Sequence, residues 1–168
     1  RQRPPELVLL ETPCVRRAVA GRNVLGSRAM RVLLDAASVK RGLIRVAGQI
    51  AERHHGSSGL VLVGIRRGGV PVAERLRSCL ERIEPGEIAM GTVDITLYRD
   101  DLGKAETQPV VRRTEIPFAI NDKKVVLVDD VLYTGRSCRA AMDALMDLGR
   151  PRLLQLAVLV DRGHRELP

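Results

Sequence analysis

The chain has 168 residues, of which 45% are hydrophobic and 29% are charged, and its formal net charge is +8. This composition is typical of one folded domain and argues against a disordered chain, and no apolar run approaches the length of a bilayer span. The three cysteines show neither a CxxC pattern nor zinc-site spacing with histidine, so we expect free thiols in a reducing cytoplasm.

The positive charge favours an anionic partner such as a phosphate or a nucleic acid. Seven arginines and two glutamates lie within residues 1–34, so most of the net charge belongs to the N-terminal part. A basic tail is as often a solvated arm as an RNA-binding surface, and both interpretations stay open. The chain has only three aromatic residues and no tryptophan, which argues against a base-stacking platform.

Residues 1–29 are rich in Arg, Pro and Gly without a sustained period, which predicts a poorly ordered basic extension. Residues 30–168 are predicted to form the folded domain. The first helix of this domain is indicated by apolar residues at helical spacing between Val39 and Ala51. Asp35 or Ser38 is placed to cap its start, and Gly56 to end it.

Strands and helices then alternate along the chain. Apolar runs predict strands at 59–65, 87–97, 124–131 and 153–161, and helical spacing predicts helices at 72–83 and 135–148. This order predicts an α/β fold with a mostly parallel twisted sheet covered by helices. Residues 98–122 are polar and aperiodic, and a stretch of that length is usually functional or mobile.

Two adjacent acids, Asp129 and Asp130, end the strand at 124–131. Ligands of open α/β sheets bind at this end of the strands, and a ribose diol or a metal would offset the cost of burying carboxylates there. The following loop, Leu132–Ser137, offers backbone amides, hydroxyls and an arginine at a helix start, which suits a phosphate. The alternative is that the acids only cap the helix; the T-G-R-S sequence that follows makes it the weaker interpretation.

The stretch "KKVVLVDDVLYTGRS" (123–137) resembles the motif with which type I phosphoribosyltransferases bind phosphoribosyl diphosphate (PRPP). Three further stretches, "DITLYRDDL" (94–102), "AAMDALMDLGRP" (140–151) and "LQLAVLVDRGHRELP" (154–168), extend the likeness. From about Met30 to the end, the chain resembles the bifunctional pyrimidine operon attenuators and uracil phosphoribosyltransferases. The resemblance implies the type I phosphoribosyltransferase fold and the conversion of uracil and PRPP to UMP and diphosphate, with Mg²⁺ on the diphosphate.

The resemblance also implies the residues that bind PRPP. The turn at 67–69 corresponds to the diphosphate-binding loop, where relatives often have a cis peptide and commonly carry Thr-Arg-Gly, so the arginine here is one place early. The two acids take the ribose hydroxyls and, through PRPP, the metal. The implied PRPP-binding set is Arg67, Gly68, Gly69, Asp129, Asp130, Val131, Leu132, Tyr133, Thr134, Gly135, Arg136 and Ser137.

The polar 98–122 segment resembles the family's mobile loop, which closes over PRPP. Tyr98, Arg99, Asp100 and Asp101 are expected to reach the site, with Arg99 neutralising the leaving diphosphate. A solvated hairpin tip is the alternative for these four residues. The implied catalytic set is Arg99, Asp100, Asp129 and Asp130.

The base is indicated by Tyr133, which stands where purine-salvage relatives usually carry an aspartate. A tyrosine offers no carboxylate at neutral pH, which favours uracil over hypoxanthine or guanine. Val160, Asp161 and Arg162 end the last strand, where relatives contact the pyrimidine.

Relatives also bind a stem-loop of pyrimidine-operon leader mRNA and, with UMP or UTP, promote transcription termination. Ile44 and Gly48 stand where relatives have polar RNA-associated positions, and neither can donate a side-chain hydrogen bond, which argues against RNA binding at this helix. The altered turn at 67–69 and the C-terminal residues that relatives have beyond "HRELP" favour, as an alternative, a nucleotide-sensing RNA-binding regulator with vestigial or no catalysis. A ligand-free scaffold also stays open. The expected RNA contacts are Arg41, Arg45, Arg162 and Arg165.

The resemblance also leads to expectations about the two ends of the chain and about its oligomeric state. Relatives begin close to Met30 and continue beyond "HRELP", so we expect Met30 to be an ancestral start and the hood over the base to be incomplete. Relatives assemble as dimers or larger oligomers, which implies a homo-oligomer.

Overall fold

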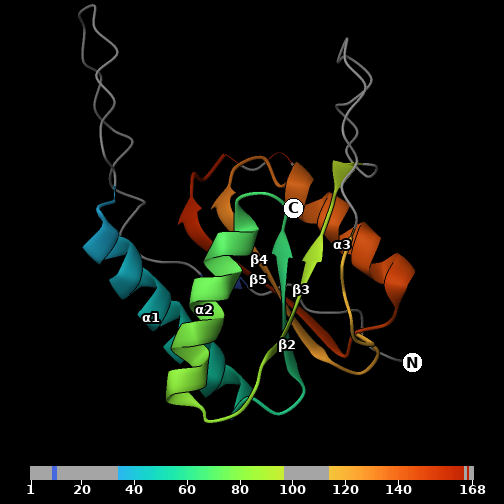
Figure 1. Cartoon of the computed structure of the whole chain (residues 1–168). Helices are drawn as coiled ribbons and strands as arrows, with labels where there is room; N and C mark the ends of the chain where they lie inside the picture. Colours follow the sequence, from blue (N-terminus) through green and yellow to red (C-terminus); the bar gives the residue numbers. More distant parts are fainter. Residues whose placement is uncertain (1–8, 11–33, 97–113, 165, 167–168) are drawn as a thin grey trace, which may run out of the picture.

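The structure is a computed structural model, and it describes residues 9–10, 34–96, 114–164 and 166 (Figure 1). Five strands form one sheet in the order β1-β5-β4-β2-β3, and every neighbouring pair is parallel. The elements in chain order are β1 Leu9–Leu10, α1 Ala36–His54, β2 Leu60–Ile65, α2 Gly69–Ile83, β3 Ala89–Val93, β4 Lys124–Leu132, α3 Arg136–Leu148 and β5 Leu153–Asp161. The predicted α/β fold with a parallel sheet is therefore confirmed.

Helices cover both faces of the sheet: α1 and α2 lie on one face and α3 on the other (Figure 1). The alternation of side chains along a strand produces the two cores. In β2, Leu60 and Leu62 pack with α1 and α2, whereas Val61 and Val63 pack in the cluster that contains α3. Because both faces are covered, all six residues of β2 are buried, which explains its uninterrupted apolar sequence.

The capping prediction for α1 is confirmed at Asp35, whose Oδ1 accepts a hydrogen bond of 2.7 Å from the Ser38 N–H. A buried hydrogen bond of 2.6 Å between His54 and Gln155 joins the end of this helix to β5. It gives partners to two polar groups that burial alone would penalise.

Two predicted boundaries differ from the structure. Helix α2 begins at Gly69 rather than at Val72, since Pro71 lies in its first turn, where a backbone N–H has no helical acceptor. Strand β3 spans 89–93 rather than 87–97, because the chain turns at Asp94, whose Oδ1 accepts from the Thr96 N–H at 2.9 Å.

The N-terminal part and the polar segment are described only in part. Residues 9 and 10, within the segment predicted to be poorly ordered, form a short parallel strand beside β5, and the rest of 1–33 lies outside the described residues. The division of the chain at residue 30 stays a prediction. None of the helices in the described ranges is long and apolar enough to cross a bilayer.

Candidate active site

The two acids at the end of β4 lie directly against the turn that precedes α2. A Cβ added at Gly68 would collide with the Asp130 carboxylate, and one added at Gly69 would collide with the Val128 carbonyl oxygen. At Gly69, only glycine permits so close an approach of the two main chains. Two motifs about 60 residues apart in the sequence therefore meet at one place, as the parallel sheet predicts for the carboxyl ends of neighbouring strands.

The turn itself contains a cis peptide bond between Arg66 and Arg67, as the resemblance implies. Arg66 is held on both sides: its N–H donates to the Val93 carbonyl oxygen at 2.9 Å, and its Nη2 lies 3.3 Å from Oε2 of Glu115. The Arg67 side chain is exposed, so a cationic group remains at the surface of the turn. This turn presents main-chain groups and positive charge beside the paired acids.

The paired acids differ in their surroundings. Asp129 is partly buried, and this burial raises the pKa of its carboxyl to about 7, to which the adjacent Asp130 also contributes, against the lowering effect of a backbone hydrogen bond. The bond in question is donated by the Asp130 N–H to Asp129 Oδ1 at 3.0 Å. Asp130 is exposed, and its Oδ1 accepts from the Val131 N–H at 2.8 Å. Burial therefore destabilises the ionised form of Asp129, and a ligand that donates hydrogen bonds to this carboxylate would offset that cost.

The loop after β4 leads into the N-terminus of α3. Gly135 is the N-cap residue and makes no side-chain capping bond, and the Arg136 N–H lies 3.5 Å from Thr134 Oγ1. The start of a helix attracts anions through its first N–H groups and its dipole. The geometry of this loop therefore suits the phosphate that the sequence predicts.

The segment after β5 lies beside this loop. Val160 pairs with Val131, and Asp161 pairs with Leu132, across the β4–β5 ladder. The Arg162 guanidinium carbon lies 4.0 Å from the centre of the Tyr133 ring, a cation–π contact. The three predicted base-binding residues thus lie next to the predicted PRPP-binding run, and their role stays a prediction.

Several predicted site residues are not among those that the structure describes. Tyr98, Arg99, Asp100 and Asp101 lie outside the described residues, and so does Arg165. Their roles stay predictions.

The two predicted RNA contacts on α1 are both exposed. Arg41 and Arg45 lie on this helix, and Arg41 Nη2 donates to Ser38 Oγ at 2.8 Å. The RNA-binding role of Arg41, Arg45 and Arg162 stays a prediction.

A metal would have few ligands from the protein. Within the described residues, no group of three or more His, Cys, Asp or Glu side chains is close enough to hold an ion. Asp129 and Asp130 supply carboxylate oxygens, the donors that Mg²⁺ prefers, but this ion also needs oxygens from its substrate. The pair fits a metal that is carried mainly by PRPP.

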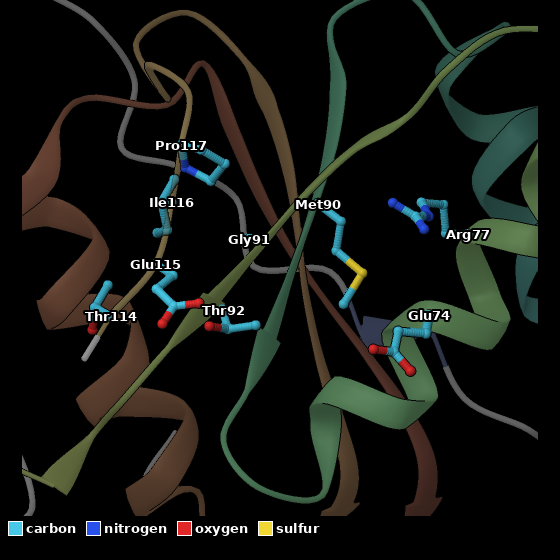
Figure 2. Close-up of a pocket in the computed structure, with 9 residues that line it drawn as sticks. All are labelled: Glu74, Arg77, Met90, Gly91, Thr92, Thr114, Glu115, Ile116 and Pro117. Atoms are coloured by element: carbon cyan, nitrogen blue, oxygen red, sulfur yellow. The ribbon is translucent and has the colours of Figure 1, made fainter. Parts of the chain in front are cut away.

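A separate cavity of about 570 Å³ lies at the outer edge of β3. Figure 2 shows Glu74 and Arg77 on the α2 side and residues 114–117 on the other, with Met90, Gly91 and Thr92 of the strand between them. Thr92 and Glu115 exchange both backbone hydrogen bonds at 2.8 Å, so the returning end of the polar segment is fixed at this edge. Through Glu115, the same end is ion-paired to the turn at residue 66.

Sequence reasoning missed two residues near the site. Glu166 pairs with Arg136, and Glu115 pairs with Arg66. Glu115 belongs to no motif, and Glu166 lies in the 154–168 stretch without a role assigned to it. Each partner lies at least 30 residues away in the sequence. No local pattern identifies either contact.

Comparison with known proteins gives the class. Residues 32–168 match the family described as "Phosphoribosyl transferase domain". The fold resembles a purine phosphoribosyltransferase from Pyrococcus horikoshii (TM-score 0.60, 24% identity, 80% of each chain). It also resembles the HGPRT-ase from Leishmania tarentolae in complex with GMP (TM-score 0.64, 14% identity, 82% of this chain and 75% of that one). These structures share the fold, and together with the family match they define the chain as a phosphoribosyltransferase.

Two curated relatives are more similar in sequence. The chain is 59% identical over 142 residues to the bifunctional protein PyrR of Pelotomaculum thermopropionicum, covering 84% of this chain and 78% of the relative. It is 62% identical over 138 residues to the bifunctional protein PyrR of Geobacter sulfurreducens, covering 82% and 77%. The chain belongs to the bifunctional PyrR family within the phosphoribosyltransferases. The family and the class of enzyme predicted from the sequence are confirmed.

Proposed function

We propose that the chain transfers the phosphoribosyl group of PRPP to uracil, and that it does so where β2, β4 and β5 end. In this reaction the bond from the sugar C1 to diphosphate breaks, a bond from C1 to N1 of uracil forms, and the N1 proton is released. The observation that carries the proposal is the contact of the Asp130 carboxylate with the Gly68 main chain, which joins the ribose-binding and diphosphate-binding motifs in one site.

In this site Asp129 and Asp130 accept hydrogen bonds from the two ribose hydroxyls. Burial raises the pKa of Asp129 to about 7, so the free protein holds this carboxyl partly protonated near neutral pH. Hydroxyl donors stabilise the ionised form, and PRPP binding therefore lowers the pKa of Asp129 and becomes tighter as the pH rises.

The 5′-phosphate lies at the N-terminus of α3. The loop Tyr133–Ser137 surrounds it with main-chain N–H groups and the hydroxyls of Thr134 and Ser137. These groups fix one end of PRPP while the acids fix its sugar, which leaves C1 in a defined position for attack.

The diphosphate lies at the turn of residues 66–69. Arg67 and the main chain of Gly68 and Gly69 contact it. Asp129 and Asp130 would help to hold the Mg²⁺ that PRPP carries, and this ion would supply neutralisation of the charge that develops on the leaving group. Arg99 completes this neutralisation from the polar segment, and Asp100 reaches the site beside it. The ion pair of Arg66 with Glu115 supports their role, since it fixes the returning end of that segment beside the turn.

Uracil lies between the end of β5 and Tyr133. Val160, Asp161 and Arg162 line its place, and Tyr133 supplies no carboxylate for a purine ring. The absence of an acid at this position of the loop favours the pyrimidine.

The second activity is regulation of the pyrimidine operon through binding of leader mRNA in response to UMP or UTP. Arg41 and Arg45 are exposed on α1 and, with Arg162 and Arg165, provide phosphate contacts. We place the protein in the cytoplasm as a homo-oligomer, as the family resemblance implies.

The test is nucleotide formation from PRPP and Mg²⁺ with uracil, hypoxanthine and guanine in separate reactions. We expect UMP from uracil and no nucleotide from the purines, and Asp130→Asn should greatly reduce UMP formation. A purine nucleotide without UMP would contradict the assignment of the base. Tight, UMP-dependent binding of leader RNA without turnover would instead support the regulator with vestigial catalysis.

A further inference from the structure

The segment that follows β5 runs alongside the loop between β4 and α3 and is bonded to it at several points. The Arg162 N–H donates to the Leu132 carbonyl oxygen, and the Glu166 N–H donates to the Thr134 carbonyl oxygen, each at 2.9 Å. Between these bonds, the Arg162 guanidinium covers the Tyr133 ring. We call residues 162–164 and 166 the post-β5 segment. Its contacts link the proposed base side of the site to the proposed phosphate side.

The last of these contacts involves the arginine of the phosphate loop. Arg136 Nε and Nη2 lie 3.2 and 3.0 Å from the same oxygen, Oε2 of Glu166. The guanidinium therefore directs two of its donors at a carboxylate of the protein. Its own main-chain N–H remains at the helix start, within 3.5 Å of Thr134 Oγ1. The main chain and the side chain of this residue thus serve different partners.

An ion pair between exposed side chains contributes little by itself, and both partners are exposed here, with 40% of the Arg136 and 56% of the Glu166 side chain accessible. A backbone hydrogen bond beside this ion pair increases its contribution to stability: the Glu166 N–H is already bonded to the carbonyl oxygen of Thr134, two residues before the arginine. The backbone bond holds the carboxylate in place, so less side-chain freedom is lost when the ion pair forms. Its effect is to fix the position of the post-β5 segment.

We propose that Arg136 is a positioning residue: its side chain holds Glu166, and thereby keeps the post-β5 segment, with Arg162 over Tyr133, in register with the phosphate loop. The proposal rests on the proposed function for its effect on uracil. It assigns phosphate binding at this residue to the main-chain N–H and not to the guanidinium. The competing interpretation is that the guanidinium binds the 5′-phosphate and that Glu166 competes with the phosphate for it.

The two interpretations predict opposite results for Glu166→Gln. If Arg136 holds the segment, the KM for uracil rises roughly three- to tenfold while the KM for PRPP changes less than about twofold, because only the base side loses its register. If Glu166 competes with phosphate, the KM for PRPP falls instead, since the variant frees the guanidinium. A fall of the PRPP KM would overturn the proposal.

A charge exchange separates the roles further. Arg136→Glu should raise the KM for uracil, and the double variant Arg136→Glu, Glu166→Arg should restore much of the loss, because the ion pair is re-formed in reverse. If the guanidinium binds the phosphate, the double variant stays as poor as Arg136→Glu alone, and that result would also overturn the proposal. Arg139→Gln is the matched control, since Arg139 is exposed on the same helix, one turn further on.

A second readout does not depend on catalysis. Amide hydrogen exchange of Glu166 reports the bond to Thr134 directly, and this amide should exchange faster in Arg136→Gln and in Glu166→Gln, but not in Arg139→Gln. If the wild-type protein makes no UMP, the proposed function fails and the exchange experiment still decides the contact. Unchanged exchange in both variants would refute the positioning role.

Discussion

Replacing Asp129 by asparagine should stabilise the free protein at pH 8 and have little effect at pH 5. Burial raises the pKa of this carboxyl from 3.8 to about 7. Because the folded-state pKa lies above the unfolded value, the stabilising contribution of the protonated carboxyl is complete below pH 3.8. It is lost as the pH rises through about 7, so at pH 8 the folded protein contains an ionised carboxylate in an unfavourable place.

The size of the effect follows from the shift. One unit of pKa corresponds to about 1.4 kcal/mol, so ionised Asp129 costs the folded state roughly 4 kcal/mol at pH 8. Asparagine keeps an oxygen for the Asp130 N–H but loses the charge on that bond, a loss of about 1 kcal/mol. The net gain in the free energy of unfolding is about 3 kcal/mol, or roughly 6–12 °C in Tm for a chain of this length. At pH 5 the same reasoning gives a net gain in the free energy of unfolding of less than about 1 kcal/mol.

The assay is urea unfolding of the wild type and of Asp129→Asn at pH 5, 6, 7 and 8, with equal m-values as the condition for comparison. Asp143→Asn is the control, since Asp143 is an exposed acid on α3 away from the pair. An Asp129→Asn variant that is less stable than the wild type at pH 8, or a gain that does not change with pH, would refute the reasoning. The stabilised variant should also lose PRPP binding, since the carboxylate that destabilises the folded protein is the group that binds the ribose.

Gly69→Ala should lower the free energy of unfolding by several kcal/mol and abolish UMP formation, because a Cβ there collides with the Val128 carbonyl oxygen. Gly48→Ala is the control: its Cβ meets nothing within 4 Å, and the variant should be stabilised by up to about 1 kcal/mol. Thermal melts compare the two variants, and equal Tm values would contradict the prediction. Burial lowers the pKa of His54 below 6.5, so its contribution to stability is present above pH 6.5 and is lost as the pH falls through the folded-state pKa. His54→Gln should therefore lose less stability than the wild type between pH 7 and 5, and an identical loss in urea unfolding would count against this. Leu62→Ala, at a fully buried position of β2, should cost about 2–5 kcal/mol in the same assay, and a cost below 1 kcal/mol would show that the core repacks there.

The elements that the sequence predicts well are those whose causes are local. Asp35 caps α1 because its side chain reaches an amide three residues on, and the spacing of these residues is visible in the sequence. The strand at 153–161 is apolar except for Gln155 and Asp161 because both faces of the sheet are covered, and its predicted bounds agree with the structure. β3 is shorter than its apolar run because the Asp94 side chain turns the chain, a local effect that apolar patterning does not report.

The sequence predicts the parts of the candidate site that lie within one motif, and it does not predict the contacts between segments that are distant in the sequence. The pairing of Asp129 and Asp130 at a strand end, and the glycines of the turn, are visible in the sequence. The contact of Gly68 with the Asp130 carboxylate depends on which strands are neighbours, and no local signal gives that. The ion pair of Arg136 with Glu166 depends in addition on how the chain leaves β5, so the sequence points to the arginine as a phosphate ligand while the structure gives its side chain another partner.

Isothermal titration calorimetry with PRPP and Mg²⁺ tests the central claim most directly, on the wild type and on the double variant Asp129→Asn, Asp130→Asn. The wild type should bind, and the double variant should bind at least about 100-fold more weakly, because two charge-assisted hydrogen bonds to the ribose are lost. Equal affinity of the two proteins for PRPP, with both folded, would contradict the assignment of the paired acids to the sugar.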